Sequence, residues 1–498
     1  MATTHNTLDR QILITGGVVV LGMIMAILDA TIVNVAIPTL GGDFHTSIST
    51  IQWVMTGYLL ALASVIPLTA WATDRFGAKR VWIASLIVFM TGSALAGAAW
   101  SIDALIVFRV LQGCGAGLLM PVGQTILAQA AGPQRIGRVM SVVGVPMLLG
   151  PIFGPVIGGA IVDQASWRWI FFVNLPIGLI AVLLASRLLP EATPRLDQRL
   201  DLRGLALLSP GLAILVYGMS EAGAAGGFGA GRALAGVALG LVLLALFALH
   251  AWRRGRAALI DVSLFARRGF AAAAGTNLLV GIALFGALIL LPLYYQLVRG
   301  ESPLATGLLL VPQGLGAALA MPIAGRLTDE IGARAVIPFG IVLALVGTAA
   351  YTQVGANTSY VLLAGSLFVI GLGLGSTIMP SMAVAYQAVP REAVPQATST
   401  INVIQRIAGS VGTALLAVVL QRSIASNLHG FVGGIGAIAR LSPKGRSQAA
   451  PALAAAFGTA FWVALGLLAA ALIPALLLPR IRAQGAQGAE PAAEGRSR

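Results

Sequence analysis

The sequence predicts an all-α membrane protein made of two six-helix bundles with an inserted pair of helices between them. Three observations predict this fold. Of the 498 residues, 58% are hydrophobic and only 10% are charged, whereas a soluble domain carries about a quarter charged residues. The hydrophobic residues form long blocks, and a membrane-spanning helix needs roughly 20 of them. Finally, a motif in the first half of the chain recurs in the second half.

Fourteen apolar blocks are long enough to cross a bilayer, and most are separated by short loops. The first block continues past Leu28 without a small-residue cleavage site, so we expect a retained helix and not a signal peptide. The predicted spans lie near residues 13–38, 51–71, 79–99, 104–130, 136–162, 168–189, 203–220, 232–251, 269–298, 303–326, 335–353, 359–386, 397–421 and 453–479.

The formal net charge is +14, and the positions of the basic residues along the chain indicate how the protein is oriented in the membrane. Most of the 31 Lys and Arg residues fall in alternate loops, which we place in the cytoplasm. An excess of basic residues in cytoplasmic loops is the positive-inside bias. We therefore expect a multi-pass protein of the inner (plasma) membrane, in contact with the lipid bilayer, with both termini in the cytoplasm. The basic balance does not indicate a nucleic-acid partner.

An internal repeat predicts two halves of the same topology. The segment TDRFGAK at residues 73–79 recurs as TDEIGAR at residues 328–334, each time between the second and third helices of a half. GCGAG at residues 113–117 is echoed by GLGLG at residues 371–375 at nearly the same separation. Parallel repeats of this kind relate two bundles by an axis along the membrane normal. We expect a first bundle over 1–200, the inserted pair over 201–255, and a second bundle with a cytoplasmic tail over 256–498.

Five motifs follow one another along the chain: LDATIVNVAIP from Leu28, DRFGAKR from Asp74, RVLQG from Arg109, a Gly-Pro series over 144–159, and WRWIFFVNLPIG from Trp167. In this order they resemble the major facilitator superfamily, and specifically its fourteen-span drug:proton antiporter branch, the EmrB/QacA-like exporters. The likeness covers nearly the whole chain, although Ala70 stands where the loop signature usually has Gly. The resemblance implies the major facilitator fold and proton-driven export of small lipophilic compounds or drugs by alternating access.

Asp29 is the acidic residue that the prediction places well inside a helix. It precedes Pro38 by nine residues, which puts it about 14 Å from the outer end of its span. A charge at this depth costs about 2.5–3.5 kcal/mol and is usually functional. A carboxyl that is protonated when buried and ionised when exposed suits proton coupling, and Arg109 is its natural partner. The alternatives are an Asp29 that only bonds neighbouring helices and an Arg109 that reaches to the membrane interface.

The two repeated loops predict a gate. Asp74 and Asp329 lie at cytoplasmic ends of helices, where an acid opposes the helix dipole and needs a cation or the N-terminus of another helix. We expect this contact to hold the cytoplasmic side closed in the outward-facing state, and the alternative is a solvated charged loop. The gate candidates are Asp74, Arg75, Gly77, Lys79, Arg80, Asp329, Gly332 and Arg334.

The fifth helix resembles the antiporter helix of the branch, and its candidate residues are Gly150, Pro151, Gly154, Pro155, Gly158 and Gly159. Arg406 lies about ten residues into the thirteenth span, so it either faces the substrate cavity or ties helices together. The other cavity candidates are polar residues for which helix packing or an interfacial position is an equal alternative. They are Asn34, Gln52, Tyr58, Gln112, Asn277, Tyr294, Tyr295 and Gln313.

The sequence lacks the patterns of an enzyme or an ATP-driven pump. Neither Lys79 nor Lys444 follows a Gly, so there is no Walker A motif. The single cysteine, Cys114, supports neither a disulfide framework nor a thiolate metal site. We expect no enzymatic activity and no cofactor. An importer or metabolite permease of the same fold and a membrane receptor or assembly factor are the alternative functions. A periplasmic adaptor and an outer-membrane channel are partners that the sequence neither indicates nor excludes.

Overall fold

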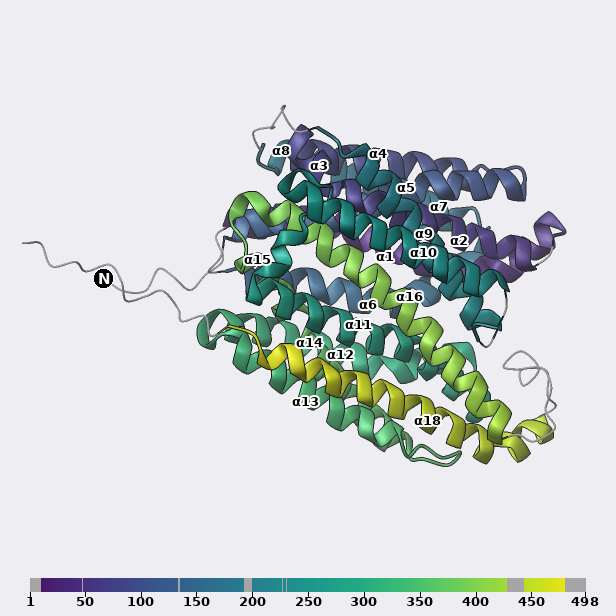
Figure 1. Cartoon of the computed structure of the whole chain (residues 1–498). Helices are drawn as coiled ribbons and strands as arrows, with labels where there is room; N and C mark the ends of the chain where they lie inside the picture. Colours follow the sequence, from purple (N-terminus) through teal and green to yellow (C-terminus); the bar gives the residue numbers. More distant parts are fainter. Residues whose placement is uncertain are drawn as a thin grey trace, which may run out of the picture.

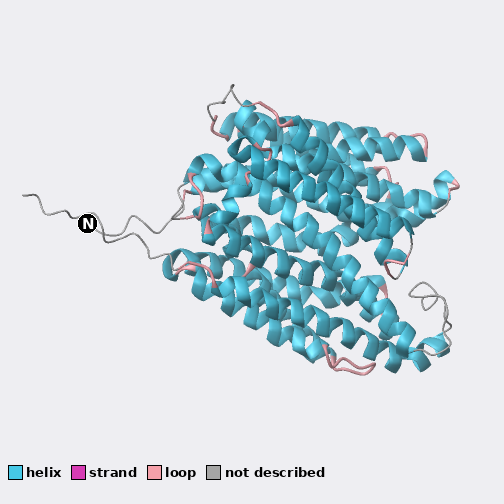
Figure 2. Cartoon of the chain, viewed as in Figure 1, coloured by secondary structure: helices cyan, strands magenta, loops and turns pink. Residues whose placement is uncertain are grey.

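The computed structural model describes residues 10–46, 48–132, 135–191, 199–225, 227–229, 231–427 and 443–479. Figure 2 shows helices joined by loops, and no strand occurs within these ranges. Thirteen helices of the described part are long and apolar enough to cross a membrane. A further apolar helix of 29 residues, α6, lies between the fourth and sixth spans. The predicted all-α, fourteen-span fold is therefore confirmed.

The first half contains six spans, which Figure 1 shows in purple to blue. Pro67 has no backbone N–H, and around it the second span changes from α-helix to a short 3-10 turn. The spans are α1 (Arg10–Phe44), α2 (Ile48–Val65) with η1 (Ile66–Leu68) and α3 (Thr69–Phe76), α4 (Ala78–Gly97), α5 (Ile102–Ala131), α6 (Ile136–Gln164), and α7 (Trp169–Phe172) with α8 (Asn174–Leu188).

The inserted pair consists of α9 (Leu202–Ala225) and α10 (Gly231–Arg254), and η2 (Gly255–Ala257) and η3 (Val262–Ala266) connect it to the second half. The predicted cytoplasmic tail, residues 480–498, lies outside the described residues. The spans of the second half are α11 (Arg268–Leu293) with the π-helical η4 (Tyr294–Val298), α12 (Pro303–Ile331), α13 (Ala333–Tyr351), α14 (Tyr360–Gly375) with α15 (Ile378–Gln387), η5 (Arg391–Ala393) with α16 (Val394–Asn427), and α18 (Pro443–Leu476).

Both copies of the repeated loop have the same backbone conformation. Gly77 follows α3 with φ 85° and ψ 139°, and Gly332 follows α12 with φ 91° and ψ 147°. Residues with a Cβ rarely adopt this positive φ, so the turn requires glycine in both copies. The repeat in the sequence is therefore a repeat in the structure.

The helix contacts repeat in the same register. A Cβ at Gly113 in α5 would collide with the carbonyl oxygen of Tyr58 in α2. A Cβ at Gly371 in α14 would collide with the carbonyl oxygen of Gln313 in α12. Tyr58 and Gln313 are 255 positions apart, as Asp74 and Asp329 are. The glycines let the two helices of each pair approach closely, and they identify equivalent residues of the two halves.

The end of the molecule that carries the two repeated loops, residues 73–80 and 328–334, is called here the basic-loop end. In Figure 1 the first half lies above the second, with α9 and α10 running across the front. The inserted helix α9 packs against α2 of the first half and α16 of the second half. Each half also buries aromatic side chains of its own, such as Trp82 and Phe89 in the first and Phe457 and Phe461 in the second.

Candidate functional site

Asp29 and Arg109 form an ion pair in the interior of the first half. Nη1 of Arg109 in α5 donates to Oδ2 of Asp29 in α1 at 2.6 Å, and both side chains are 0% exposed. Removing one member of such a pair leaves the other as a buried, uncompensated charge, which typically costs 3–5 kcal/mol. The two residues are therefore held together as a unit.

Two uncharged side chains complete the hydrogen bonds of the Asp29 carboxylate. Its Oδ1 accepts from Nε2 of Gln112 at 2.9 Å and from Nδ2 of Asn174, at the start of α8, also at 2.9 Å. Nδ2 of Asn174 donates in addition to Oγ of Ser93 in α4 at 3.0 Å. Gln112 was predicted as a cavity residue, whereas Asn174 and Ser93 were not predicted as site residues. Three helices, α1, α5 and α8, thus meet at one carboxylate, and α4 is linked to it through Asn174.

The Arg109 guanidinium is held by further contacts on its other sides. Its Nη1 also donates to Oε1 of Gln112 at 2.7 Å, and its Nε donates to the carbonyl oxygen of Val54 at 3.3 Å. The guanidinium carbon lies 4.0 Å from the centroid of the Tyr58 ring and 5.6 Å from that of Phe171. Aromatic faces stabilise a cation electrostatically where water is excluded. Tyr58 therefore acts on the ion pair through its ring.

The predicted antiporter helix, α6, packs against the segment of α1 that carries Asp29. A Cβ at Gly150, Gly154 or Gly158 would collide with Ile27, Thr31 or Ile32 respectively, whereas one at Gly159 would make an ordinary contact. Oγ1 of Thr31 lies 3.4 Å from the carbonyl oxygen of Gly150. The side chains of Pro151 and Pro155 lie outside the described residues. The close approach of the two backbones depends on glycine at three successive turns of α6.

At the basic-loop end, Asp329 at the end of α12 caps the first turn of α6 in the other half. Its carboxylate oxygens accept from the backbone N–H groups of Gly137 at 3.2 Å and of Arg138 at 3.3 Å. Nε of Arg138 is 3.8 Å from the same carboxylate. A carboxylate is stabilised at a helix N-terminus, because the unpaired N–H groups and the dipole both favour negative charge. Arg334, the cation expected from the sequence, is exposed, and no ion pair of it is found among the described residues.

The first copy of the gate loop forms an ion pair at the surface. Nζ of Lys79 is 3.8 Å from Oε1 of Glu191, whose side chain is 70% exposed, and such surface pairs contribute little to stability. Asp74 and Arg75 are half-buried and Arg80 is exposed.

Equivalent positions in the second half lack the charges. A Cβ at Gly92 in α4 would collide with the backbone of Gln112, and one at Gly347 in α13 would collide with the backbone of Ile370. Gln112 and Ile370 are therefore equivalent residues of the two halves. An isoleucine thus stands in the second half where the first half has a ligand of the Asp29 carboxylate.

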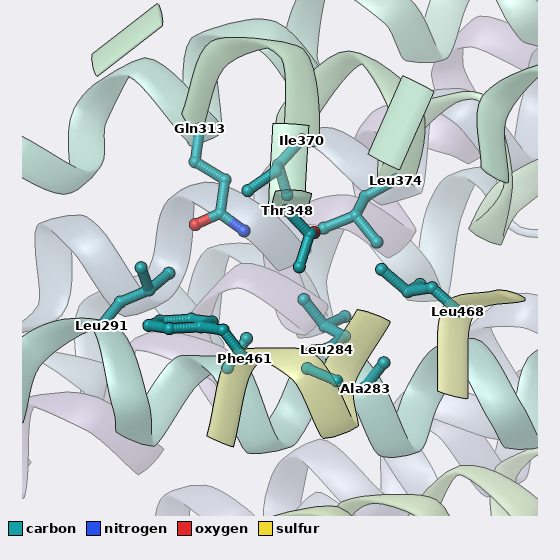
Figure 3. A pocket seen from close by; sticks show the side chains of 11 residues that line it. Ala283, Leu284, Leu291, Gln313, Thr348, Ile370, Leu374, Phe461 and Leu468 are labelled. Atoms are coloured by element: carbon teal, nitrogen blue, oxygen red, sulfur yellow. The ribbon is translucent and has the colours of Figure 1, made fainter. Parts of the chain in front are cut away.

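A small cavity marks this place in the second half. It has a volume of about 20 Å³, and Leu284, Gln313, Ile370 and Phe461 are among its lining residues. Figure 3 shows Gln313 pointing from α12 toward this space. Leu284 is 255 positions after Asp29, the spacing of the repeat. The cavity holds about one water molecule and no drug-sized compound.

The remaining cavity candidates have other surroundings. Nδ2 of Asn277 donates to Oγ of Ser381 at 2.8 Å, and the Tyr294 hydroxyl donates to the carbonyl oxygen of Gly355 at 2.9 Å, so both bond within the second half. Arg406 in α16 is partly buried and interacts electrostatically with the Tyr58 hydroxyl across the two halves. Tyr295 is buried in the second half, Gln52 is exposed at the start of α2, and the side chain of Asn34 lies outside the described residues.

The sequence and the fold both match known transporters. The family described as Major Facilitator Superfamily matches residues 19–413. The chain is 40% identical over 494 residues to the multidrug resistance protein B homolog of Mycobacterium tuberculosis, which covers 96% of this chain and 92% of that protein. It is 32% identical over 404 residues to the multidrug export protein EmrB of Escherichia coli, which covers 79% of this chain and 77% of that protein.

Two solved structures share the fold. The human organic anion transporter MFSD10 (TETRAN) superposes with a TM-score of 0.62 at 17% identity, over 95% of this chain and 100% of that chain. The proton:xylose symporter XylE superposes with a TM-score of 0.61 at 14% identity, over 95% of this chain and 97% of that chain. These findings indicate a membrane transporter and not an enzyme. With the family matched over most of its length and a relative 40% identical across nearly all of it, the chain belongs to the major facilitator superfamily.

Proposed function

We propose that this chain exports small lipophilic compounds in exchange for protons, by alternating access of its two halves. The names of the relatives, a multidrug resistance protein and a multidrug export protein, support the substrate class and the direction. The close packing of α6 on α1, through the glycines of the predicted antiporter helix, supports exchange over import.

The observation that carries the proposal is the buried charge in the first half and its absence from the equivalent place in the second. The second half has Ile370 where the first half has Gln112, and the apolar Leu284, 255 positions after Asp29, lines the cavity beside it. The same helix arrangement therefore forms without an ion pair, so helix packing does not require it. A charge that is costly in the membrane and unnecessary for the fold is best explained by proton coupling.

Protonation of Asp29 would change this site in a defined way. A neutral carboxyl no longer balances the Arg109 guanidinium, and one of its oxygens gains an O–H donor and becomes a weaker acceptor. The bonds from Arg109, Gln112 and Asn174 are then weaker than those to the carboxylate, which makes a rearrangement of α1, α5 and α8 easier. One proton entering across 100 mV releases about 2.3 kcal/mol, which supports roughly a fifty-fold gradient of an uncharged substrate. No ATP is needed for export against such a gradient.

The two halves are joined at the basic-loop end by the bonds of Asp329 with the first turn of α6. We place this end in the cytoplasm of a cell with the protein in its inner (plasma) membrane, because the basic loops lie there. The conformation described here is then closed toward the cytoplasm. Opening to the cytoplasm requires these bonds to break.

Proteoliposomes with an acidic interior test the proposal, with chloramphenicol as a neutral lipophilic probe. Antiport predicts uptake of radiolabelled chloramphenicol above the external concentration, since protons leave as the probe enters, and a protonophore abolishes it. The control vesicles contain Asp103→Asn, which removes an exposed acid on the same helix as Arg109. Proton-driven movement of the probe out of acidic vesicles would indicate symport, and the absence of any protein-dependent movement would indicate a receptor. Either result would overturn the proposal.

A further inference from the structure

In the described part of the chain, several buried hydrogen-bond donors have no partner, and three of them belong to Arg406, Ser410 and Tyr58, where the two halves face each other. Nε of Arg406, Oγ of Ser410 and Oη of Tyr58 are buried and have no hydrogen-bond partner among the described residues. Arg406 and Ser410 are one turn apart on α16, so they lie on the same side of that helix. Tyr58 belongs to α2 of the first half, and its hydroxyl interacts electrostatically with Arg406. Buried donors are nearly always satisfied in a complete assembly, so this arrangement indicates a missing acceptor.

The face of α16 that carries Arg406 is turned toward the first half. Oγ of Ser399 donates to the carbonyl oxygen of Ile66 at 3.2 Å, and Nδ2 of Asn402 donates to Oε1 of Gln124 at 2.7 Å. Arg406 follows Asn402 by one turn on the same face. Arg406 therefore lies on the side of α16 that faces the first half, one turn farther from the basic-loop end than Asn402.

Arg406 has no acidic partner among the described residues. The carboxylate of Asp29, which also interacts with Tyr58, is already bonded to Arg109 at 2.6 Å. A cation in a membrane-spanning helix is costly when it is unpaired, and it usually marks a substrate or ion pathway. A guanidinium provides a planar set of N–H donors that matches the oxygens of a carboxylate, phenolate or sulfonate.

We propose that Arg406, together with the hydroxyl groups of Ser410 and Tyr58, binds the negatively charged group of the transported compound. One cation then balances one charge, and the two hydroxyl groups donate further hydrogen bonds to the same oxygens. The preferred substrates are accordingly lipophilic monoanions. This inference rests on the proposed transport function, because it assigns the substrate class of that transporter.

Equilibrium binding of two matched fluorescent probes to the purified full-length protein in nanodiscs tests the assignment. Anilinonaphthalene sulfonate carries one negative charge, and N-phenylnaphthylamine has the same rings without the sulfonate. We expect the wild-type protein to bind the sulfonate more tightly. Arg406→Gln should weaken sulfonate binding about tenfold or more, the effect of losing a hydrogen bond to a charged group, and change naphthylamine binding by less than about twofold. Arg406→Lys should retain part of the preference.

The controls separate a binding role from a structural one. Arg232→Gln removes an exposed cation elsewhere in the chain and should leave both affinities unchanged, which excludes adsorption of the dye to surface charge. Ser410→Ala and Tyr58→Phe should each weaken only the sulfonate, by a smaller factor, and they test the site if Arg406→Gln does not fold. Equal weakening of both probes, or no selective loss in any of the three variants, would overturn the assignment. The assay uses no proton gradient, so a failure of proton-driven export would leave its result unaffected.

Discussion

Leu284 of α11 lies 255 positions after Asp29 of α1, the same separation as that of the two repeated aspartates, Asp74 and Asp329. Leu284 lines a cavity of about 20 Å³, whereas Asp29 is bonded to Arg109, Gln112 and Asn174. The two halves have similar helix arrangements, but the buried network around Asp29 belongs to the first half. This asymmetry is the basis for assigning proton coupling to the first half.

The first prediction concerns this asymmetry. Leu284→Ala should lower the stability of the protein by about 2–5 kcal/mol, because it enlarges an existing cavity. It should leave the number of protons exchanged per substrate unchanged, since no coupling group is lost. Thermal unfolding in detergent and proton flux in proteoliposomes measure the two effects. A folded Leu284→Ala protein that transports without coupling would show that the second half also takes part in proton coupling.

The second prediction concerns Asn174. Asn174→Leu removes one of the two hydrogen bonds to Oδ1 of Asp29, and hydrogen bonds of this kind favour the ionised carboxylate. Protonation then becomes easier, so we expect the pH profile of export to move toward higher pH. Asn427→Leu, the same substitution at an exposed position of α16, is the matched control and should leave the profile in place. An unchanged profile in Asn174→Leu would mean that Asn174 only packs helices together.

Much of the fold was accessible from the sequence. Apolar blocks and short loops are sufficient to locate spans, because each span must satisfy its own backbone in lipid. The ends are less well determined: α1 continues past Pro38 to Phe44 and α16 begins at Val394, before the predicted residue 397. A helix that leaves the bilayer can continue without any change in its hydrogen bonding, so hydropathy does not mark where it stops.

Of the site residues, the sequence could identify only those that carry a charge inside a span or lie in a recognisable motif. Asp29 and Arg109 could be paired because charges inside spans are rare. Asn174 and Ser93 are uncharged, and Asn174 is 145 positions after Asp29. Their contact with the ion pair could therefore not be predicted from the spacing of residues along the chain. The contact of Asp329 with α6 depends on how the two halves face each other, which the repeat within each half does not specify.

The third prediction concerns the gate. Asp329→Asn removes the charge that interacts with the N-terminus of α6 and with Arg138, and should slow transport and lower stability by about 1 kcal/mol. Arg334→Gln, a change at an exposed residue five positions after Asp329, should have little effect on either. Asp74→Asn should also slow transport if both repeated loops act as gates, whereas Arg498→Ala should not. Initial rates of chloramphenicol uptake compare the variants, and equal rates in all four would leave the loops with no role in gating.

The fourth prediction concerns Asp201, which lies just before α9 and caps it. Burial raises the pKa of Asp201, but hydrogen bonds from the backbone of Gly204, the His250 ring and the backbone of Leu259 lower it by more, so that the net pKa is below the ordinary value. The carboxylate therefore stabilises the fold above the pKa of the unfolded chain, and this stability is lost as the pH falls through the folded pKa.

Asp201→Asn should accordingly be less stable than the wild type at neutral pH, by about 0.3–1 kcal/mol for the loss of a negative charge at a helix N-terminus. The difference should shrink below about pH 4, where the unfolded-state carboxyl protonates. Thermal unfolding in detergent across this pH range measures the difference. A gap that stays constant down to strongly acidic pH would show that the charge of Asp201 contributes nothing.

The central claim is that Asp29 carries the proton. It is tested most directly by the proton movement that a chloramphenicol gradient drives across proteoliposomes without an imposed pH gradient, recorded with a pH-sensitive dye. The account predicts a protonophore-sensitive pH change with the wild type and with Asp103→Asn. With Asp29→Asn it predicts none, although the folded variant still binds the probe. A pH change of wild-type size in Asp29→Asn vesicles, at matched protein content, would contradict the account.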